Sequence, residues 1–143
     1  MNLFISFDWD DRLQVGGFRS MLSNPQVYNL NHRDTSVRHD YSEFGNQAIK
    51  NAILQKIQQS NVTVCLISQK TKNSHWVNWE LEQSRLNRKG IVGFILKNQP
   101  VSTLQGCPEF FTRYETNFKV YPWSSPEDMS KRIQEASYTH QIF

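Results

Sequence analysis

Short runs of apolar residues recur along the chain, and polar stretches separate them. The runs Leu3–Phe7, Val62–Ser68 and Ile91–Leu96 are typical of strands buried on both faces, as in a parallel sheet. Gln26–Leu30 alternates apolar and polar positions, which predicts a strand nearer the edge of the sheet. Phe118–Tyr121 predicts a short fifth strand. The pattern therefore predicts five strands distributed along the whole chain.

Apolar positions at helical spacing predict a helix after most of these strands. The first helix is indicated between Leu13 and Leu22, with Leu13 itself on the apolar face, and the second between Ala48 and Ile57. Val77–Ser84 marks the inner face of a third helix. Pro126–Ser137 predicts the last helix, with Ser125 as its N-cap.

Two stretches are predicted to be loops. Asn31–Asn46 is polar, and its central part, His32–Gly45, holds two arginines and two histidines. A polar loop of this length in a compact domain is usually functional. Lys97–Glu109 contains two prolines and a glycine, which indicates a second loop.

Alternating strands and helices predict an α/β fold, a doubly wound parallel sheet of five strands. The flavodoxin-like strand order 2-1-3-4-5 is the expected one. A length of 143 residues predicts a single domain spanning residues 1–143.

In such sheets, ligands bind beyond the carboxyl ends of the strands, at the point where the strand order reverses. Here that point lies between the first and third strands. Trp76 and Glu80 are four residues apart, so a helix places them on one face. Glu80 is the candidate catalytic residue, and the candidate substrate-binding residues around this crevice are Phe7, Asp8, Trp9, Ser68 and Trp76.

Composition narrows the classes of partner. The net charge is +3, and no run of five or six like charges occurs, so nucleic acid is not an expected partner, whereas an anionic nucleotide is compatible. No stretch approaches the roughly 18 apolar residues of a membrane span, and no secretory signal is visible. Cys65 and Cys107 are expected to be free thiols in the cytoplasm, and no metal site is expected because no ligand spacing surrounds them.

The same residues carry a resemblance to a known family. The opening run LFISFDWDD resembles the first strand of TIR domains, and VTVCLIS followed by NSHWVNWEL is similar to their third strand and the helix after it. Ser74, Trp76 and Glu80 match the serine, tryptophan and glutamate typical of that helix. The chain most resembles the TIR-like domains of bacterial Thoeris antiphage systems, from Leu3 to about Leu96.

The resemblance implies an enzyme that cleaves NAD at the nicotinamide–ribose bond, with Glu80 as the catalytic glutamate and NAD as substrate. It also implies that the remaining ADP-ribose becomes a signal nucleotide, often a cyclic isomer, which activates a separate effector protein. No metal is required, because nicotinamide is already a cationic leaving group. TIR domains often self-associate, so TIR–TIR contacts are expected as well.

Other interpretations of these residues stay open. One alternative is an interaction module that only self-associates or binds another TIR domain, with His32–Gly45 as an assembly surface and Glu80 dispensable. Glu80 also has a separate interpretation as a solvated helix residue. Asp8, Asp10 and Asp11 have an alternative interpretation as acids that complement a helix dipole. Ser6 is interpreted as a packing residue rather than a nucleophile, because no G-x-S-x-G motif surrounds it. A phosphorylated receiver domain would need an aspartate after the third strand, where this chain has Ser68.

Overall fold

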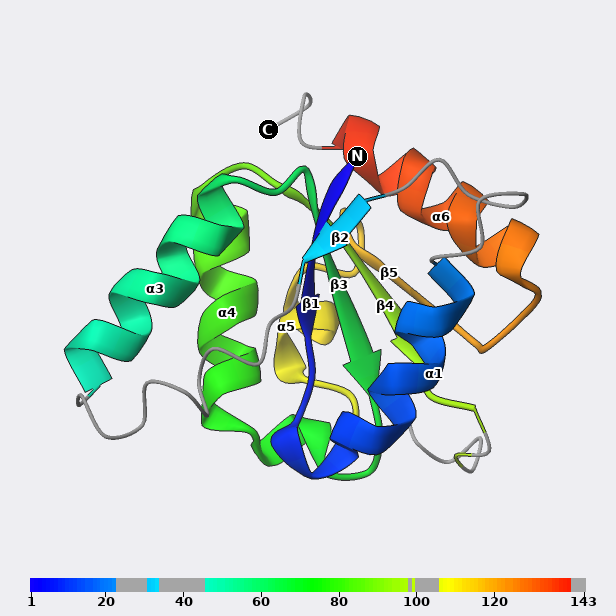
Figure 1. Cartoon of the computed structure of the whole chain (residues 1–143), viewed down its shortest axis with the longest axis horizontal. Coiled ribbons are helices and arrows are strands. Elements are labelled where there is room, and N and C mark those ends of the chain that lie inside the picture. The colour runs from blue at the N-terminus through cyan, green and yellow to red at the C-terminus, as the bar shows by residue number, and fades with distance from the viewer. Residues whose placement is uncertain (23–30, 34–45, 98, 100–105, 140–143) are drawn as a thin grey trace.

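The computed structural model describes residues 1–22, 31–33, 46–97, 99 and 106–139. A parallel sheet lies at its centre, between two layers of helices (Figure 1). The strands pair in the order β2-β1-β3-β4-β5, which agrees with the expected order, and all four pairings are parallel. Their bounds are β1 Asn2–Ser6, β2 Asn31–Arg33, β3 Val62–Ile67, β4 Gly90–Ile95 and β5 Lys119–Tyr121. The predicted α/β class with a parallel sheet is confirmed.

Helices cover both faces of this sheet. Helices α1 (Arg12–Leu22) and α6 (Pro126–Thr139) lie on one face (Figure 1). Helices α3 (Asn46–Gln58), α4 (His75–Leu86) and α5 (Glu109–Arg113) lie on the other. The sheet is therefore buried on both sides, which explains why its inner strands are continuous apolar runs.

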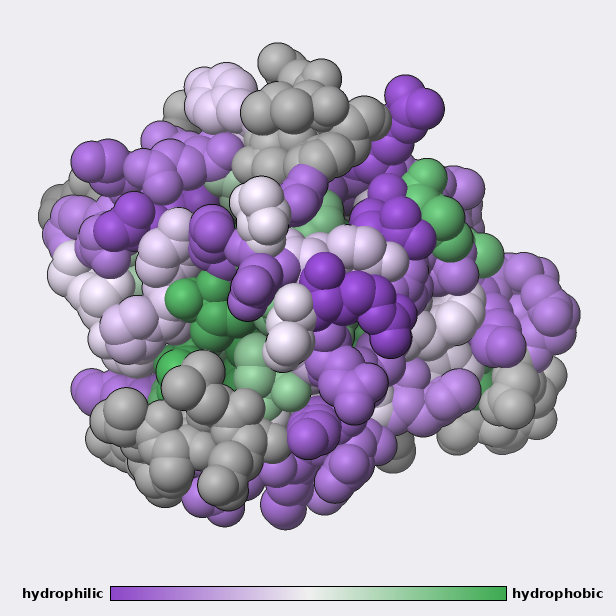
Figure 2. Space-filling model, turned by 180° about the vertical axis from the view of Figure 1, so that it is seen from behind, coloured by the Kyte–Doolittle hydropathy of each residue, from purple (hydrophilic) through white to green (hydrophobic). Residues whose placement is uncertain are grey.

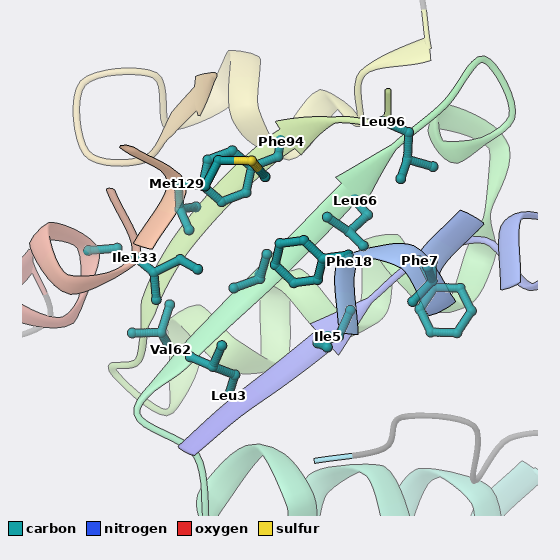
Figure 3. Close-up of a cluster of buried hydrophobic side chains, with 14 residues drawn as sticks. Leu3, Ile5, Phe7, Phe18, Val62, Leu66, Phe94, Leu96, Met129 and Ile133 are labelled. Carbon is teal, nitrogen blue, oxygen red and sulfur yellow. The ribbon is translucent and has the colours of Figure 1, made fainter. Parts of the chain in front are cut away.

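Alternation along β1 decides which side chain meets which helix layer. Leu3, Ile5 and Phe7 point into the core shared with α1 and α6 (Figure 3). Phe4 points the opposite way and packs against three isoleucines of α3. Because successive side chains of a strand point to opposite faces, Ser6 lies on the side of α3 and α4.

The helix predictions hold for the buried face of α4 and fail for one residue of α1. Val77, Leu81 and Ser84 are all buried, as predicted. Leu13 was placed wrongly, because its side chain is 86% exposed whereas Val15 is fully buried. A short 3-10 helix, η1 (Trp9–Asp11), precedes α1.

The cap predicted for the last helix is also present. The Ser125 hydroxyl accepts a hydrogen bond from the backbone N–H of Asp128 at 3.2 Å. This bond satisfies one of the backbone donors that every helix leaves unpaired in its first turn. Helix α6 accordingly begins at Pro126, whose missing N–H costs nothing there.

The loop predictions need two corrections. The stretch expected to be a loop from Asn31 to Asn46 begins with strand β2 and ends at the first residue of α3, and residues 34–45 lie outside the described part. The strand predicted at Gln26–Leu30 also falls outside it. The stretch Lys97–Glu109 ends in α5, a helix that the sequence pattern did not predict.

The described surface is mostly polar. Figure 2 shows the side turned away from Figure 1 as largely hydrophilic, with only small hydrophobic areas. Among the residues that the structure describes, three large hydrophobic side chains are exposed, Leu13, Leu86 and Tyr138, and each belongs to a different helix. Within the described ranges, no helix combines the length and the apolar character that crossing a membrane requires.

Candidate functional site

Helix α4 carries the candidate catalytic residue, and a serine fixes where this helix begins. The Ser74 hydroxyl accepts a hydrogen bond from the backbone N–H of Val77 at 3.4 Å, so Ser74 is the N-cap and the helix starts at His75. Trp76 therefore lies in the first turn, and Glu80 follows one turn later on the same side of the helix.

Glu80 is fully buried beneath α4 and is bonded to the sheet. Its Oε1 accepts a hydrogen bond from the Ser6 hydroxyl at 2.6 Å, and Ser6 is itself fully buried at the end of β1. This distance lies in the range of about 2.5–2.7 Å that is typical of hydroxyl–carboxylate bonds. The interpretation of Glu80 as a solvated helix glutamate is therefore wrong. The interpretation of Ser6 as a packing residue is incomplete, because its hydroxyl bonds to Glu80.

A second pair of hydroxyls joins α4 to the sheet one helical turn further on. The Ser84 hydroxyl donates to the backbone carbonyl of Glu80 at 2.8 Å and lies 2.7 Å from the hydroxyl of Thr63 on β3. Thr63 and Ser84 are both fully buried. Two polar contacts therefore join α4 to β1 and β3.

Trp76 packs toward α3. Its ring meets that of Trp79 edge to face at 5.8 Å, and both rings pack, partly buried, against Phe4 and the isoleucines of α3. The sequence predicted a core position for Trp79 and a pocket wall for Trp76, whereas the structure gives both residues the same apolar support. Trp76 lies one helical turn before Glu80 on α4.

A second polar cluster lies where β1 and β3 end. The Ser68 hydroxyl donates to Oδ2 of Asp11 at 2.6 Å, and the backbone N–H of Ser68 donates to the Thr71 hydroxyl at 2.8 Å. Burial raises the pKa of Asp11 above its ordinary value, although the hydrogen bond from Ser68 opposes that shift. The sequence treated Asp11 as one of several acids at a helix start and missed its buried bond to Ser68.

The remaining candidates lie on the same side of the sheet as α1. Oδ1 of Asp8 accepts a hydrogen bond from the backbone N–H of Asp10 at 2.9 Å and so caps η1. Phe7 is fully buried in the core, and its ring stacks on Trp9 at 6.1 Å. The Arg12 guanidinium lies 5.4 Å from the Trp9 ring centre.

The predicted residues thus form two groups instead of one. Asp8, Trp9 and Ser68 gather with Asp11 around the ends of β1 and β3, and Phe7 lies in the core below them. Glu80 is on the other face of the sheet, bonded to the last residue of β1. The polarity of position 6, on the same face as the apolar Phe4, is the sequence signal that would have linked Ser6 to the site.

The two cysteines are free thiols, as expected. Cys65 lies in register with Ser6 on the neighbouring strand and is fully buried. Burial holds the pKa of the Cys65 thiol well above its ordinary value, and the nearby charges of Cys107 and Glu80 add to this shift. Cys65 therefore stays protonated and places a small neutral group beside the Glu80 site.

The arrangement suits stabilisation of a positive charge better than nucleophilic attack by a serine. In its ionised form, a carboxylate oriented by a hydroxyl donor presents a fixed negative charge, and burial strengthens its electrostatic effect. In the described residues, no group of three His, Cys, Asp or Glu side chains is arranged to hold a metal ion.

Comparison with known proteins assigns the chain to a family. A family model described as "Thoeris protein ThsB, TIR-like domain" matches residues 4–100, which include the end of β1 and the whole of β3, α4 and β4. No curated protein matches the chain in sequence. The match covers more than half of the 143 residues and includes both Ser6 and Glu80. The chain therefore belongs to the family of Thoeris ThsB proteins with a TIR-like domain.

Proposed function

We propose that this protein cleaves NAD at the nicotinamide–ribose bond and converts the remaining ADP-ribose into a signal nucleotide. Membership of the Thoeris family supports a role in antiphage defence. The observation that carries the enzymatic proposal is the carboxylate of Glu80, which is buried on α4 and bonded to Ser6 at the carboxyl end of β1.

The proposed reaction needs one carboxylate and no general acid. The bond between C1′ of the ribose and the pyridinium nitrogen breaks, and its electron pair goes to that nitrogen, so nicotinamide leaves as a neutral molecule. The ribose becomes an oxocarbenium-like cation, as in glycoside cleavage. The Glu80 carboxylate stabilises this cation by its charge and by contact with the ribose hydroxyls.

The fate of the cation decides the product. Attack by water on C1′ gives ADP-ribose and a proton. Attack by a nitrogen of the adenine in the same molecule gives a cyclic isomer, the product we favour, and this path requires that water be kept away. Trp76 and its partner Trp79 supply the apolar wall for that exclusion. The signal then acts on a separate effector protein.

Burial of Glu80 has a consequence for activity. Because the carboxylate is fully buried, NAD reaches it only after neighbouring groups move. We therefore expect weak activity in dilute isolated protein, and stronger activity after phage infection or when TIR domains assemble with one another. We propose that activity depends on infection or on assembly in this way. We also propose that the protein acts in the cytoplasm.

A second candidate, a TIR interaction module without catalysis, is favoured by one observation. The bond between Ser6 and Glu80 also ties α4 to β1, so Glu80 has a structural use in the folded chain. In that case the domain would bind other TIR domains and leave NAD intact.

One experiment separates the two. NAD is incubated with concentrated protein, and with lysate of phage-challenged cells that express it, and nucleotides are resolved by chromatography with mass detection. Glu80→Gln is compared with Glu82→Gln, a matched control on the same helix whose carboxylate pairs with Arg85 at 3.1 Å near the surface. We expect nicotinamide from wild type and Glu82→Gln but not from Glu80→Gln. Equal NAD loss in all three, or none in any, favours the interaction module.

A further inference from the structure

The Ser6 hydroxyl donates its hydrogen bond to the Glu80 carboxylate. A serine hydroxyl carries one hydrogen, and Ser6 gives it to Oε1 of Glu80 at 2.6 Å. Both side chains are fully buried, so bulk water does not compete for this bond. This bond consequently ties the orientation of the Glu80 carboxylate to β1.

The backbone of α4 is anchored separately. Ser84 donates its one hydrogen to the Glu80 carbonyl, so in the contact between Ser84 and Thr63 the donor is Thr63. This second contact holds the helix on β3 whether or not Ser6 has a hydroxyl. The position of the helix and the orientation of the carboxylate therefore depend on different residues and can be changed one at a time.

A serine at this place in a strand is unusual unless its hydroxyl has a role. Its neighbour on the same face, Phe4, is apolar, and a strand buried on both faces favours apolar residues throughout. A buried hydroxyl without a partner destabilises the fold, whereas one bonded to a carboxylate does not. The residue type at position 6 is explained by Glu80 and not by packing.

We propose that Ser6 is a positioning residue, whose hydroxyl fixes the plane of the Glu80 carboxylate so that this carboxylate can stabilise the ribosyl cation. This inference rests on the NAD-cleaving function proposed above. Ser6 does not itself touch substrate. Its contribution is the orientation of the group that does, and active sites are sensitive to errors of about 1 Å in such groups.

Loss of the hydroxyl has two expected kinetic effects. Ser6→Ala lowers kcat by about 10- to 100-fold, because the carboxylate is no longer held in its productive orientation, while KM changes little. The acid limb of the pH–rate profile moves to higher pH, because a donor that favours the ionised carboxylate is gone. If Ser6 only packed in the core, Ser6→Ala would change neither kcat nor the acid limb of the pH–rate profile in this way.

The activity arm compares three variants under conditions in which wild type cleaves NAD. Ser6→Ala removes the donor, Ser6→Thr keeps a hydroxyl and is expected to recover most of kcat, and Thr63→Val removes the separate helix anchor. Thr63→Val is expected to lower thermal stability and leave both kcat and the pH profile unchanged. If Ser6→Ala does not fold, Ser6→Cys under reducing conditions replaces it. Wild-type kcat and an unchanged acid limb in Ser6→Ala overturn the proposal while the NAD-cleaving function stands.

The second arm does not depend on activity. The carboxyl carbons of glutamate are labelled with carbon-13, the Glu80 signal is identified by its loss in Glu80→Gln, and its titration is followed by NMR. We expect Ser6→Ala to move this titration to higher pH and Thr63→Val to leave it in place. An unmoved titration in Ser6→Ala overturns the positioning role. If the titration of Glu80 moves in Ser6→Ala but the protein never cleaves NAD, the bond between Ser6 and Glu80 exists. In that case the proposed NAD-cleaving function is wrong, and so is the positioning role of Ser6 in it.

Discussion

Replacing Ser68 with alanine removes the side-chain bond between the segment that follows β1 and the segment that follows β3. The Ser68 hydroxyl donates to Oδ2 of Asp11 at 2.6 Å and accepts from the backbone N–H of Lys70 at 3.2 Å. Asp11 is only 7% exposed, so water does not readily replace the lost donor. The bond from the Ser68 backbone to Thr71 survives, because it does not involve the hydroxyl.

The size of the effect follows from these contacts. Removing a donor from a buried charged acceptor costs about 1.5–3 kcal/mol, and the exposed Lys70 regains a water partner at little cost. We therefore expect Ser68→Ala to lower the free energy of unfolding by about 2 kcal/mol. For a domain of this size, each kcal/mol corresponds to roughly 3 °C, so Tm falls by about 6 °C.

The assay is thermal and urea unfolding at pH 7, followed by circular dichroism, in a double-mutant cycle with Asp11→Asn. Ser60→Ala is the matched control, because Ser60 is also a buried serine but donates to a neutral acceptor, the Lys56 carbonyl, at 2.8 Å. Its expected cost is about 1 kcal/mol. The reasoning is refuted if Ser68→Ala costs as much in the Asp11→Asn background as in wild type, or no more than Ser60→Ala.

Two further changes test the same region. Burial raises the pKa of Asp11 above 3.8, so the folded state binds this proton more tightly than the unfolded state, and the stability it contributes at low pH is lost as pH rises through the folded pKa. The Tm of Asp11→Asn relative to wild type should consequently increase from pH 3.8 to neutral pH, and a difference that stays constant with pH contradicts the assignment. Gly106→Ala places a Cβ against the Ser68 carbonyl oxygen and 2.7 Å from the Gln69 Cα, so we expect a loss of about 1–3 kcal/mol in urea unfolding. A fully stable Gly106→Ala would mean that this backbone contact is loose.

The central strands could be predicted from the sequence because of where they lie in the sheet. All six residues of β3 are buried, and its apolar run is correspondingly unbroken. The edge strand β2 has only three residues, Asn31–Arg33, all polar, so no hydrophobic pattern marks it. Helix α5 has five residues, and Phe110 and Phe111 hold it in the core by contacts that depend on the folded chain. A helix this short carries no periodic signal of its own.

The site was predictable to the extent that its residues lie close together in sequence. Trp76 and Glu80 were found by their spacing on one helix. The bond between Ser6 and Glu80 joins residues 74 positions apart, and the bond between Ser68 and Asp11 joins residues 57 apart. Such partners follow from the register of the sheet and the rotation of α4, neither of which a single sequence determines.

The polar residues on the inner face of α4 argue for a use beyond stability. Val77 and Leu81 give this helix ordinary apolar contacts, yet Glu80 and Ser84, one turn apart, meet hydroxyls on β1 and β3 instead. A buried charge with its partner is often no more stabilising than apolar residues of the same volume, and removing one partner is strongly destabilising. Packing alone therefore gives no reason for a carboxylate at position 80. A carboxylate held in a fixed orientation at the end of β1 is what the proposed ribosyl chemistry requires, and this agreement between an otherwise unfavourable burial and a specific reaction is the strongest structural support for catalysis by Glu80.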